Sequence, residues 1–178
     1  MLAIPPDSAV PGVLSATEMK VDCNDLIVSK TDTNSMITYA NEAFCKYSGY
    51  DENELLGQPQ NIVRHPDMPR AIFYLMWEHL KQEQEFFGYI KNCRKDGGFY
   101  WAFASVAPIY DNGRHVGFLS ARRCPSENAI ATLEPLYRKM IETEAQYGKE
   151  QQIAMSSAIL WQAINKEFAT YAEFALSL

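Results

Sequence analysis

Two short turn sequences divide residues 86–123 into three segments rich in residues that favour strands. The segments are 86–94, 99–110 and 115–123, and they are separated by Lys-Asp-Gly-Gly and Asp-Asn-Gly-Arg. Asp-Gly and Asn-Gly most strongly favour tight hairpin turns, because these residues tolerate the positive φ angles that such turns need. The three segments are therefore predicted to form an antiparallel meander, which constrains the fold more than any other feature of the chain.

The segments before this meander indicate an α+β fold. Residues 26–29 and 36–39 are two β-rich runs with a polar turn around Asp32 between them, which is typical of a hairpin. Residues 41–57 change to helical spacing, interrupted by glycine, and predict two short helices. Residues 69–85 predict a longer amphipathic helix. We expect a five-stranded antiparallel sheet with short helices on one face, followed by C-terminal helices.

The C-terminal region carries an apolar stripe at helical spacing. From Glu127 onward the pattern is helical, and Gly148 is expected to divide it into two helices or one broken helix. The stripe predicts a homodimer through these helices, whereas the alternative is that they fold back onto their own sheet. Leu160 and Ile164 are expected at the centre of the contact in either case. The residues of the apolar stripe are Ile153, Ser157, Leu160, Ile164, Phe168, Tyr171, Ala175 and Leu178.

Composition limits the classes of function. The 178 residues are 47% hydrophobic, which is enough for a core, and the net charge of −6 argues against nucleic-acid binding. The four cysteines form no Cys-x-x-Cys pair, so we expect neither a zinc site nor a disulfide framework, but a reducing cytoplasm. The chain shows neither a signal peptide nor an apolar run long enough to span a membrane.

Three regions follow from these patterns. Residues 1–20 contain three prolines and read as an N-terminal arm, residues 21–124 as the domain with the sheet, and residues 125–178 as a helical extension for signalling or dimerisation. No internal repeat is apparent. There is no Gly-x-Ser-x-Gly, His-Glu-x-x-His or Gly-x-x-x-x-Gly-Lys-Ser sequence, so an enzyme is not expected.

The stretch Asn-Ile-Val-Arg-His-Pro-Asp-Met-Pro at 61–69 has two interpretations. Asp67 and the prolines around it are typical of a helix entry, where a carboxylate caps backbone N–H groups. Alternatively, Arg64, His65 and Asp67 form a polar rim beside an apolar pocket, as binding of a flat cofactor requires. These residues alone leave both interpretations open.

Several stretches resemble a PAS domain, a fold with a curved five-stranded sheet and a ligand cavity beneath its helices. ITYANEAFCKYSGYDENELLGQ resembles the PAS core, and RKDGGFYWAFASVAPIYDNGRHVGFLSARR resembles its closing sheet. NIVRHPDMP is similar to the flavin-binding PAS domain of bacterial aerotaxis receptors. The resemblance covers about residues 24–137, and it favours the cofactor rim as the interpretation of residues 61–69.

The resemblance implies non-covalent binding of FAD. The contacts that it implies are Asn41, Arg64, His65, Asp67, Trp77 and Asn92. An amide such as that of Asn92 complements the donors and acceptors of the flavin pyrimidine edge, Trp77 offers a flat apolar surface, and Arg64 suits phosphate. The chain departs from the family at Gln60, where the family has histidine, and at Phe86, where it has tryptophan.

Other ligands remain as alternatives. Cys93 stands in Asn-Cys-Arg-Lys, which resembles the photoreactive motif of LOV domains, but it lies on a strand beside Asn92, so alternation is expected to turn it away from the cavity. Haem is the main competitor, with His65 and His79 as candidate axial ligands, whereas His115 is expected in an exposed turn. FMN in place of FAD, or a PAS module without cofactor that serves protein interaction, also remains open.

The expected function is a cytoplasmic, redox- or oxygen-responsive sensor. It would bind FAD and pass the redox state to its C-terminal helices or to a chemotaxis or other signalling partner. Receptors of this family continue into membrane and methyl-accepting regions, which are absent from these residues, so the chain is either a fragment or signals to a separate partner.

Overall fold

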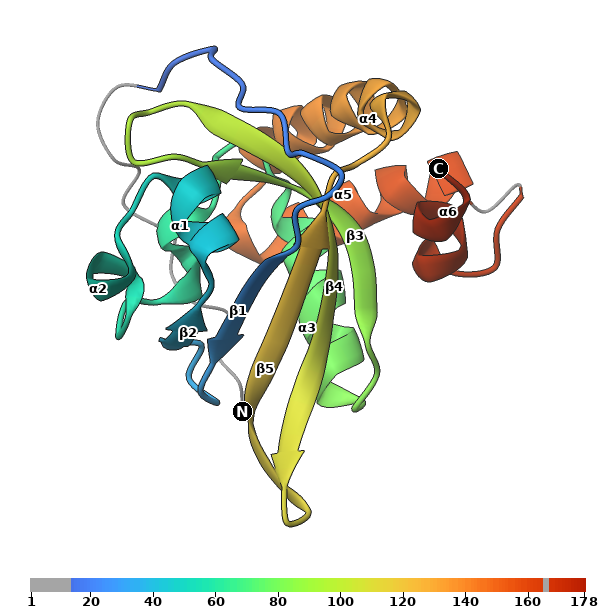
Figure 1. Ribbon diagram of the computed structural model, residues 1–178. Coiled ribbons are helices and arrows are strands. Elements are labelled where there is room, and N and C mark those ends of the chain that lie inside the picture. Colours follow the sequence, from blue (N-terminus) through green and yellow to red (C-terminus); the bar gives the residue numbers. More distant parts are fainter. Residues whose placement is uncertain (1–13, 165–166) are drawn as a thin grey trace.

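Five strands form a single antiparallel sheet in the computed structural model, which describes residues 14–164 and 167–178 (Figure 1). The strand order is β2-β1-β5-β4-β3, so β5 lies at the centre. The predicted hairpin and meander and the α+β class are confirmed. The strands are β1 (Ile27–Thr31), β2 (Ile37–Ala40), β3 (Phe86–Cys93), β4 (Phe99–Asp111) and β5 (Arg114–Arg123).

Helices connect and cover the strands. Asn41 caps the first of them by accepting the backbone N–H of Phe44, and Gly49 ends it with a φ of 74°, which glycine adopts readily. In the described residues no helix is both long and apolar enough to cross a membrane. The helices are α1 (Glu42–Ser48), α2 (Glu52–Leu55), a 3₁₀ turn (Gln60–Val63), α3 (Arg70–Lys81), α4 (Glu127–Gln146), α5 (Lys149–Ile164) and α6 (Tyr171–Ser177).

The two faces of the sheet carry different helices. Successive side chains of a strand point to opposite faces. Ile90 and Asn92 of β3 accordingly face a cavity that α3 also lines. Lys91 between them lies under α4 together with Trp101, and the ring of Tyr137 from α4 lies 6.1 Å from that of Trp101. Helix α4 therefore contacts the sheet on the face opposite the cavity.

The C-terminal helices fold back onto their own domain. Leu160 and Ile164 of α5 are each only 1% exposed, as expected for the centre of the contact, and α5 packs against α3 and α4. The ring of Tyr171 from α6 stacks on that of Phe86 in β3, with centroids 5.7 Å apart. Figure 1 shows α5 and α6 beside the sheet of their own chain. Half of the stripe, including its centre, is buried there, so the fold-back alternative to the dimer interpretation holds for these residues.

The break in the C-terminal helices comes where it was expected, but the sequence interpretation missed α6. Chain direction changes between Gln146 and Lys149, around Gly148. Thr170 then starts α6, because its hydroxyl accepts the N–H of Glu173 while the Glu173 carboxylate accepts the N–H of Thr170. This Thr-x-x-Glu capping box was visible in the sequence.

Part of the predicted N-terminal arm lies along the sheet. The backbone N–H of Ser15 bonds the carbonyl of Gly97, and that of Met19 bonds the carbonyl of Phe99. Lys20 forms an exposed ion pair of 2.7 Å with Glu127 at the start of α4. Residues 1–13 of the arm lie outside the described residues. The segment before β1 therefore contacts both the sheet and the helical extension.

The cysteine spacing suggested no disulfide framework and a reducing environment, but Cys23 and Cys124 form a disulfide. The two residues are 101 positions apart, so their spacing carried no signal. Antiparallel pairing of β1 with β5 places Ile27 opposite Arg122 and so brings the start of one strand beside the end of the other. Cys23 precedes β1 and Cys124 follows β5, which explains their contact. Cys45 and Cys93 remain free thiols.

The disulfide is expected to stabilise the fold. Closing a loop of about 100 residues restricts the unfolded chain, so reduction or Cys23→Ser should lower the free energy of unfolding by about 3–5 kcal/mol. Guanidinium unfolding with and without a reductant measures this difference, and Cys45→Ser serves as a control that keeps the disulfide. Alkylation of four cysteines in the denatured, unreduced protein would contradict the assignment.

Candidate functional site

A mostly apolar cavity lies between α3, the 3₁₀ turn and the inner face of the sheet. It contains about 830 Å³ of space that no protein atom fills, part of which is open to solvent. None of its lining residues is an aspartate or glutamate. They are Ser29, Thr31, Ser35, Gln60, Asn61, Val63, Arg64, Phe73, Met76, Trp77, Leu80, Ile90, Asn92, Val106, Phe118, Ser120 and Arg122.

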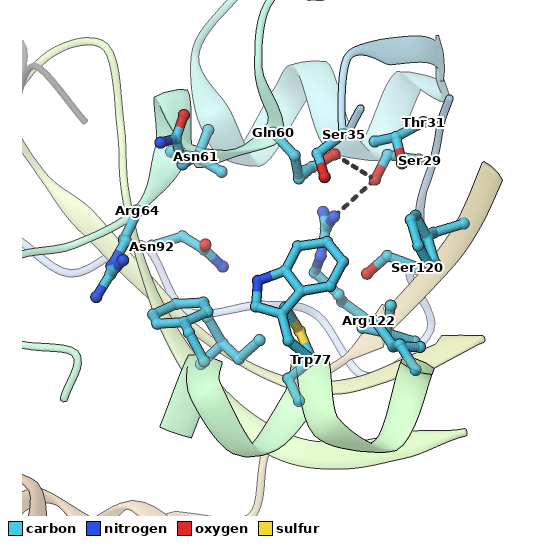
Figure 2. A pocket seen from close by; sticks show the side chains of 17 residues that line it. Ser29, Thr31, Ser35, Gln60, Asn61, Arg64, Trp77, Asn92, Ser120 and Arg122 are labelled. Atoms are coloured by element: carbon cyan, nitrogen blue, oxygen red, sulfur yellow. Dashed lines mark hydrogen bonds between the residues drawn. The ribbon is translucent and has the colours of Figure 1, made fainter. Parts of the chain in front are cut away.

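Asn92 and Trp77 lie at the cavity as the resemblance implies. Figure 2 shows the Asn92 side chain directed into the space beside the indole of Trp77. Asn92 is 5% exposed, and its side-chain N–H₂ group has no hydrogen-bond partner. Trp77 is held from α3 by an edge-to-face contact with Phe118, with centroids 5.4 Å apart. Because a buried amide donor without a partner is unfavourable, this arrangement fits a ligand that supplies an acceptor.

Arg122 also lines the cavity, although it was not predicted from the sequence as a site residue. Its Nη2 donates to the hydroxyl of Ser29 at 2.6 Å, and Ser29 in turn donates to the side-chain carbonyl of Gln60 at 3.1 Å (Figure 2). Its Nη1 is buried without a hydrogen-bond partner. Alternation along β5 was the available signal, because Phe118, Ser120 and Arg122 share one face.

Burial affects the ionisable groups at this end of the cavity. The guanidinium of Arg122 lies 4.7 Å from the centre of the Phe44 ring, and burial lowers its pKa. The group remains charged, since an arginine pKa starts so high. Burial also raises the pKa of nearby Tyr100 to about 12, so its hydroxyl is neutral. The cavity therefore contains a buried positive charge without a carboxylate among the residues that line it.

Arg64 lines the cavity near its edge, at one end of the loop 64–69. Its guanidinium lies 4.1 Å from the centre of the Phe73 ring. Its backbone pairs with Asn92 in an isolated antiparallel bridge, and the N–H of Lys91 lies 3.2 Å from the sulfur of Met68. The loop therefore runs along the free edge of β3 and links the cavity wall to the start of α3.

His65 and Asp67 lie beside the cavity lining and not within it. His65 is 4% exposed, and its Nδ1 accepts the backbone N–H of Asp67 at 3.0 Å. Burial, reinforced by the charge of Lys91, lowers the pKa of His65 to about 4, so the imidazole is neutral. The Asp67 carboxylate accepts from the Lys91 ammonium at 2.7 Å. Burial disfavours its ionisation, but Lys91 outweighs this and the pKa of Asp67 is lowered.

Asn41, the remaining residue that the resemblance implies, is not brought to the cavity. Its side-chain carbonyl accepts the N–H groups of Val28 and Phe44, and its amide donates to the carbonyl of Leu26 at 2.7 Å. Every polar atom of this side chain thus serves the backbone. The structure gives Asn41 a role in joining β1 to α1.

No histidine among the described residues lines the cavity. The Nδ1 of His79 lies 2.9 Å from the carbonyl of Leu75 and its ring faces Phe86, whereas His115 packs against Phe118 in the β4–β5 region. Both rings are half-buried, which for His115 differs from the exposed turn that the sequence predicted. The described residues also contain no cluster of three or more histidine, cysteine or acidic side chains able to hold a metal. A haem with axial histidine therefore lacks its ligand in this cavity.

Cys93 turns away from the cavity, as alternation along β3 predicts. Its thiol is buried and lies 3.6 Å from the carbonyl of Arg64, while neighbouring Asn92 faces the ligand space. Burial raises the pKa of Cys93 to about 11, so the thiol is protonated at neutral pH. This geometry does not support a photoreactive role.

The neutral, buried His65 predicts a pH dependence of stability. The unfolded chain takes up a proton near pH 6.5, whereas folded His65 does so only near pH 4. The free energy of unfolding should therefore fall as the pH is lowered from about 6.5 to about 4. His65→Asn, which keeps an acceptor for the Asp67 N–H, should flatten this slope in urea titrations, and His115→Asn should retain it. An identical slope in His65→Asn protein would refute the assignment.

Comparison with known proteins identifies the domain. Residues 37–122 match the family described as PAS fold. The chain is 45% identical over 114 residues to the aerotaxis receptor of Escherichia coli, which covers 64% of this chain and 22% of the receptor. It is 36% identical over 89 residues to the nitrogen fixation regulatory protein of Klebsiella pneumoniae, covering 50% of this chain and 18% of that protein. The matched part of the chain thus spans about a fifth of the length of each of these relatives.

Solved structures share the fold. A PAS domain from Colwellia psychrerythraea is 25% identical with a TM-score of 0.53, covering 57% of this chain and 87% of that domain. A light-oxygen-voltage domain studied with a flavin analogue is 24% identical with a TM-score of 0.54, covering 64% of this chain and 87% of that structure. Residues 37–122 therefore form a PAS domain, and the chain is similar over 114 residues to part of the aerotaxis receptor of Escherichia coli.

Proposed function

We propose that this protein is a cytoplasmic redox sensor that binds FAD non-covalently in the PAS cavity. The observation that carries the proposal is the pair of buried donors, Asn92 Nδ2 and Arg122 Nη1, that have no partner and face a cavity whose lining residues include no carboxylate. Carbonyl oxygens and ring nitrogens at the edge of an isoalloxazine would satisfy such donors. The flavin would supply reversible electron uptake.

Each residue has a distinct part in this proposal. Asn92 and Arg122 would donate hydrogen bonds to the polar edge of the ring, and Trp77 would pack against an apolar surface of the cofactor. Arg64, at the edge of the lining, would meet phosphate, because a guanidinium binds phosphate with two parallel hydrogen bonds. His65 and Asp67 would hold the loop that carries Arg64, since their contacts are with each other and with Lys91.

A hydrogen-bonded connection from this loop to the helical extension favours a sensor. The first backbone N–H groups of α3, at Arg70 and Ala71, donate to the carboxylate of Glu144 at 3.0 and 3.2 Å. Glu144 is buried and belongs to α4, so it caps a helix distant in sequence and favours its positive end. A shift of loop 64–69 on reduction of the flavin would therefore reach α4 directly.

The alternatives predict different observations. An enzyme would turn over NADH or another donor much faster than free flavin does. FMN in place of FAD would be released on denaturation, a haem protein would show a Soret band, and a module without cofactor would be colourless after incubation with FAD. The names of the relatives, a receptor and a regulatory protein, support signalling over turnover.

The purified protein is expected to be yellow, with flavin absorption bands, and to release FAD on denaturation. Asn92→Ala should weaken FAD binding by about 1–3 kcal/mol, because it removes a buried hydrogen bond. Asn128→Ala, an exposed amide on α4, is the matched control. Fluorescence titration of the apoprotein gives both affinities, and equal affinities for the Asn92 variant and the wild type would remove Asn92 from the site.

Arg64→Ala is expected to weaken FAD binding far more than riboflavin binding. Only FAD carries the phosphates with which the guanidinium would pair. Parallel titrations of both ligands with wild-type and Arg64→Ala protein give the two affinity ratios. An equal loss for the two ligands would instead indicate a defect in the cavity wall.

Glu144→Gln is expected to uncouple the cavity from α4. The substitution keeps the size of the side chain but removes its charge at the α3 N-terminus, which should lower stability by about 1–2 kcal/mol. In the wild type, reduction of bound flavin should change hydrogen exchange in α4, and this change should be smaller in Glu144→Gln. Glu142→Gln, an exposed residue of the same helix, is the control. An undiminished change in Glu144→Gln would exclude this route.

A further inference from the structure

Arg122 is a buried cation whose charge no acidic group compensates among the described residues. Its side chain is held by Ser29 through one nitrogen, while the other nitrogen lacks a hydrogen-bond partner. The side chains of Tyr100 and Arg122 are close enough for each to affect the pKa of the other, but the Tyr100 hydroxyl is neutral and the pair makes no hydrogen bond of ordinary geometry. This guanidinium thus keeps a full positive charge and an unused donor at the cavity.

An unpaired buried charge is costly, so it is informative about the ligand. Removing a charged group from water without pairing it disfavours the folded state. A ligand that brings negative charge to this point compensates that cost, whereas a neutral acceptor compensates it only in part. The cavity should therefore prefer the form of its ligand that carries negative charge near Arg122.

We propose that Arg122 determines the charge of the reduced flavin by stabilising it as an anion, which rests on the proposed function above. When two equivalents of an external one-electron donor such as a reduced viologen deliver two electrons to the ring, the donor is oxidised and N5 takes up one proton from solution. With a cation beside the pyrimidine edge, N1 stays unprotonated and the ring carries one negative charge. Without the cation, N1 takes up a second proton and the ring stays neutral.

The network behind Arg122 makes this charge a signal. Reduction would place a negative charge against a guanidinium that is tied to Ser29 of β1 and, through Ser29, to Gln60 of the 3₁₀ turn. Arg122 also lies two residues before Cys124, which is joined by disulfide to Cys23. The change in charge therefore acts on β1, β5 and the turn that leads into loop 64–69.

The test uses the full chain loaded with FAD. Titration with a reduced viologen, which delivers electrons without protons, is done at about pH 6 in unbuffered solution, where a pH indicator counts the protons taken up per flavin. An equilibrating dye gives the ratio of affinities for reduced and oxidised FAD. We expect one proton in the wild type and two in Arg122→Gln. The affinity ratio should fall about tenfold in that variant, which is about 30 mV for a two-electron couple.

Matched variants separate charge from structure. Arg122→Lys keeps a cation and should keep one proton, and Arg123→Gln, an exposed neighbour on the same strand, should behave as the wild type. If Arg122→Gln does not retain FAD, Ser29→Ala replaces it, because loss of the orienting hydroxyl should lower the affinity ratio in the same direction.

The outcomes distinguish this inference from the proposed function. Wild-type protein that binds FAD but takes up two protons on reduction, or an Arg122→Gln variant with an unchanged count and ratio, overturns the role of Arg122 and leaves FAD binding intact. Wild-type protein that binds no FAD overturns both.

Discussion

The structure depends on the pairing of β5 with strands from both ends of the domain. β5 bonds to β4, its neighbour in sequence, and to β1, which begins almost 90 residues earlier, as the register of Arg122 with both Ile27 and Ala104 shows. This pairing joins the N-terminal hairpin to the meander as one sheet. It also brings Ser29 to Arg122 and Cys23 to Cys124, so the same register creates the polar end of the cavity and the disulfide.

Strand β3 separates the two environments that a sensor has to connect. Asn92 faces the cavity, and Lys91 faces the space under α4, where it binds Asp67. The outer edge of β3 pairs with loop 64–69 at Asn92, and α6 also contacts this strand. Asn92, which faces the ligand space, is therefore adjacent in β3 to Lys91, which lies on the face that packs against α4.

Loop 64–69 unites the two interpretations of its sequence. Arg64 lines the cavity, as a cofactor rim requires, whereas His65 and Asp67 bond to each other and to Lys91 and shape the entry to α3. Asp67 does not cap α3 in the way the local sequence suggested, because the carboxylate that accepts the first N–H groups comes from Glu144. Capping by a residue more than 70 positions away has no local signature.

The sequence by itself determined the strands, the inner helices and the opposite orientation of Asn92 and Cys93, because turn dipeptides and the alternation of side chains are local. The resemblance added Arg64 and Trp77 to the cavity. Only the tertiary structure decided the partners of residues far apart in the chain: Arg122 at Ser29, Cys23 at Cys124, and the C-terminal stripe on its own domain. An apolar stripe specifies that it is buried but not against which surface, and strand pairing between distant segments depends on the whole sheet.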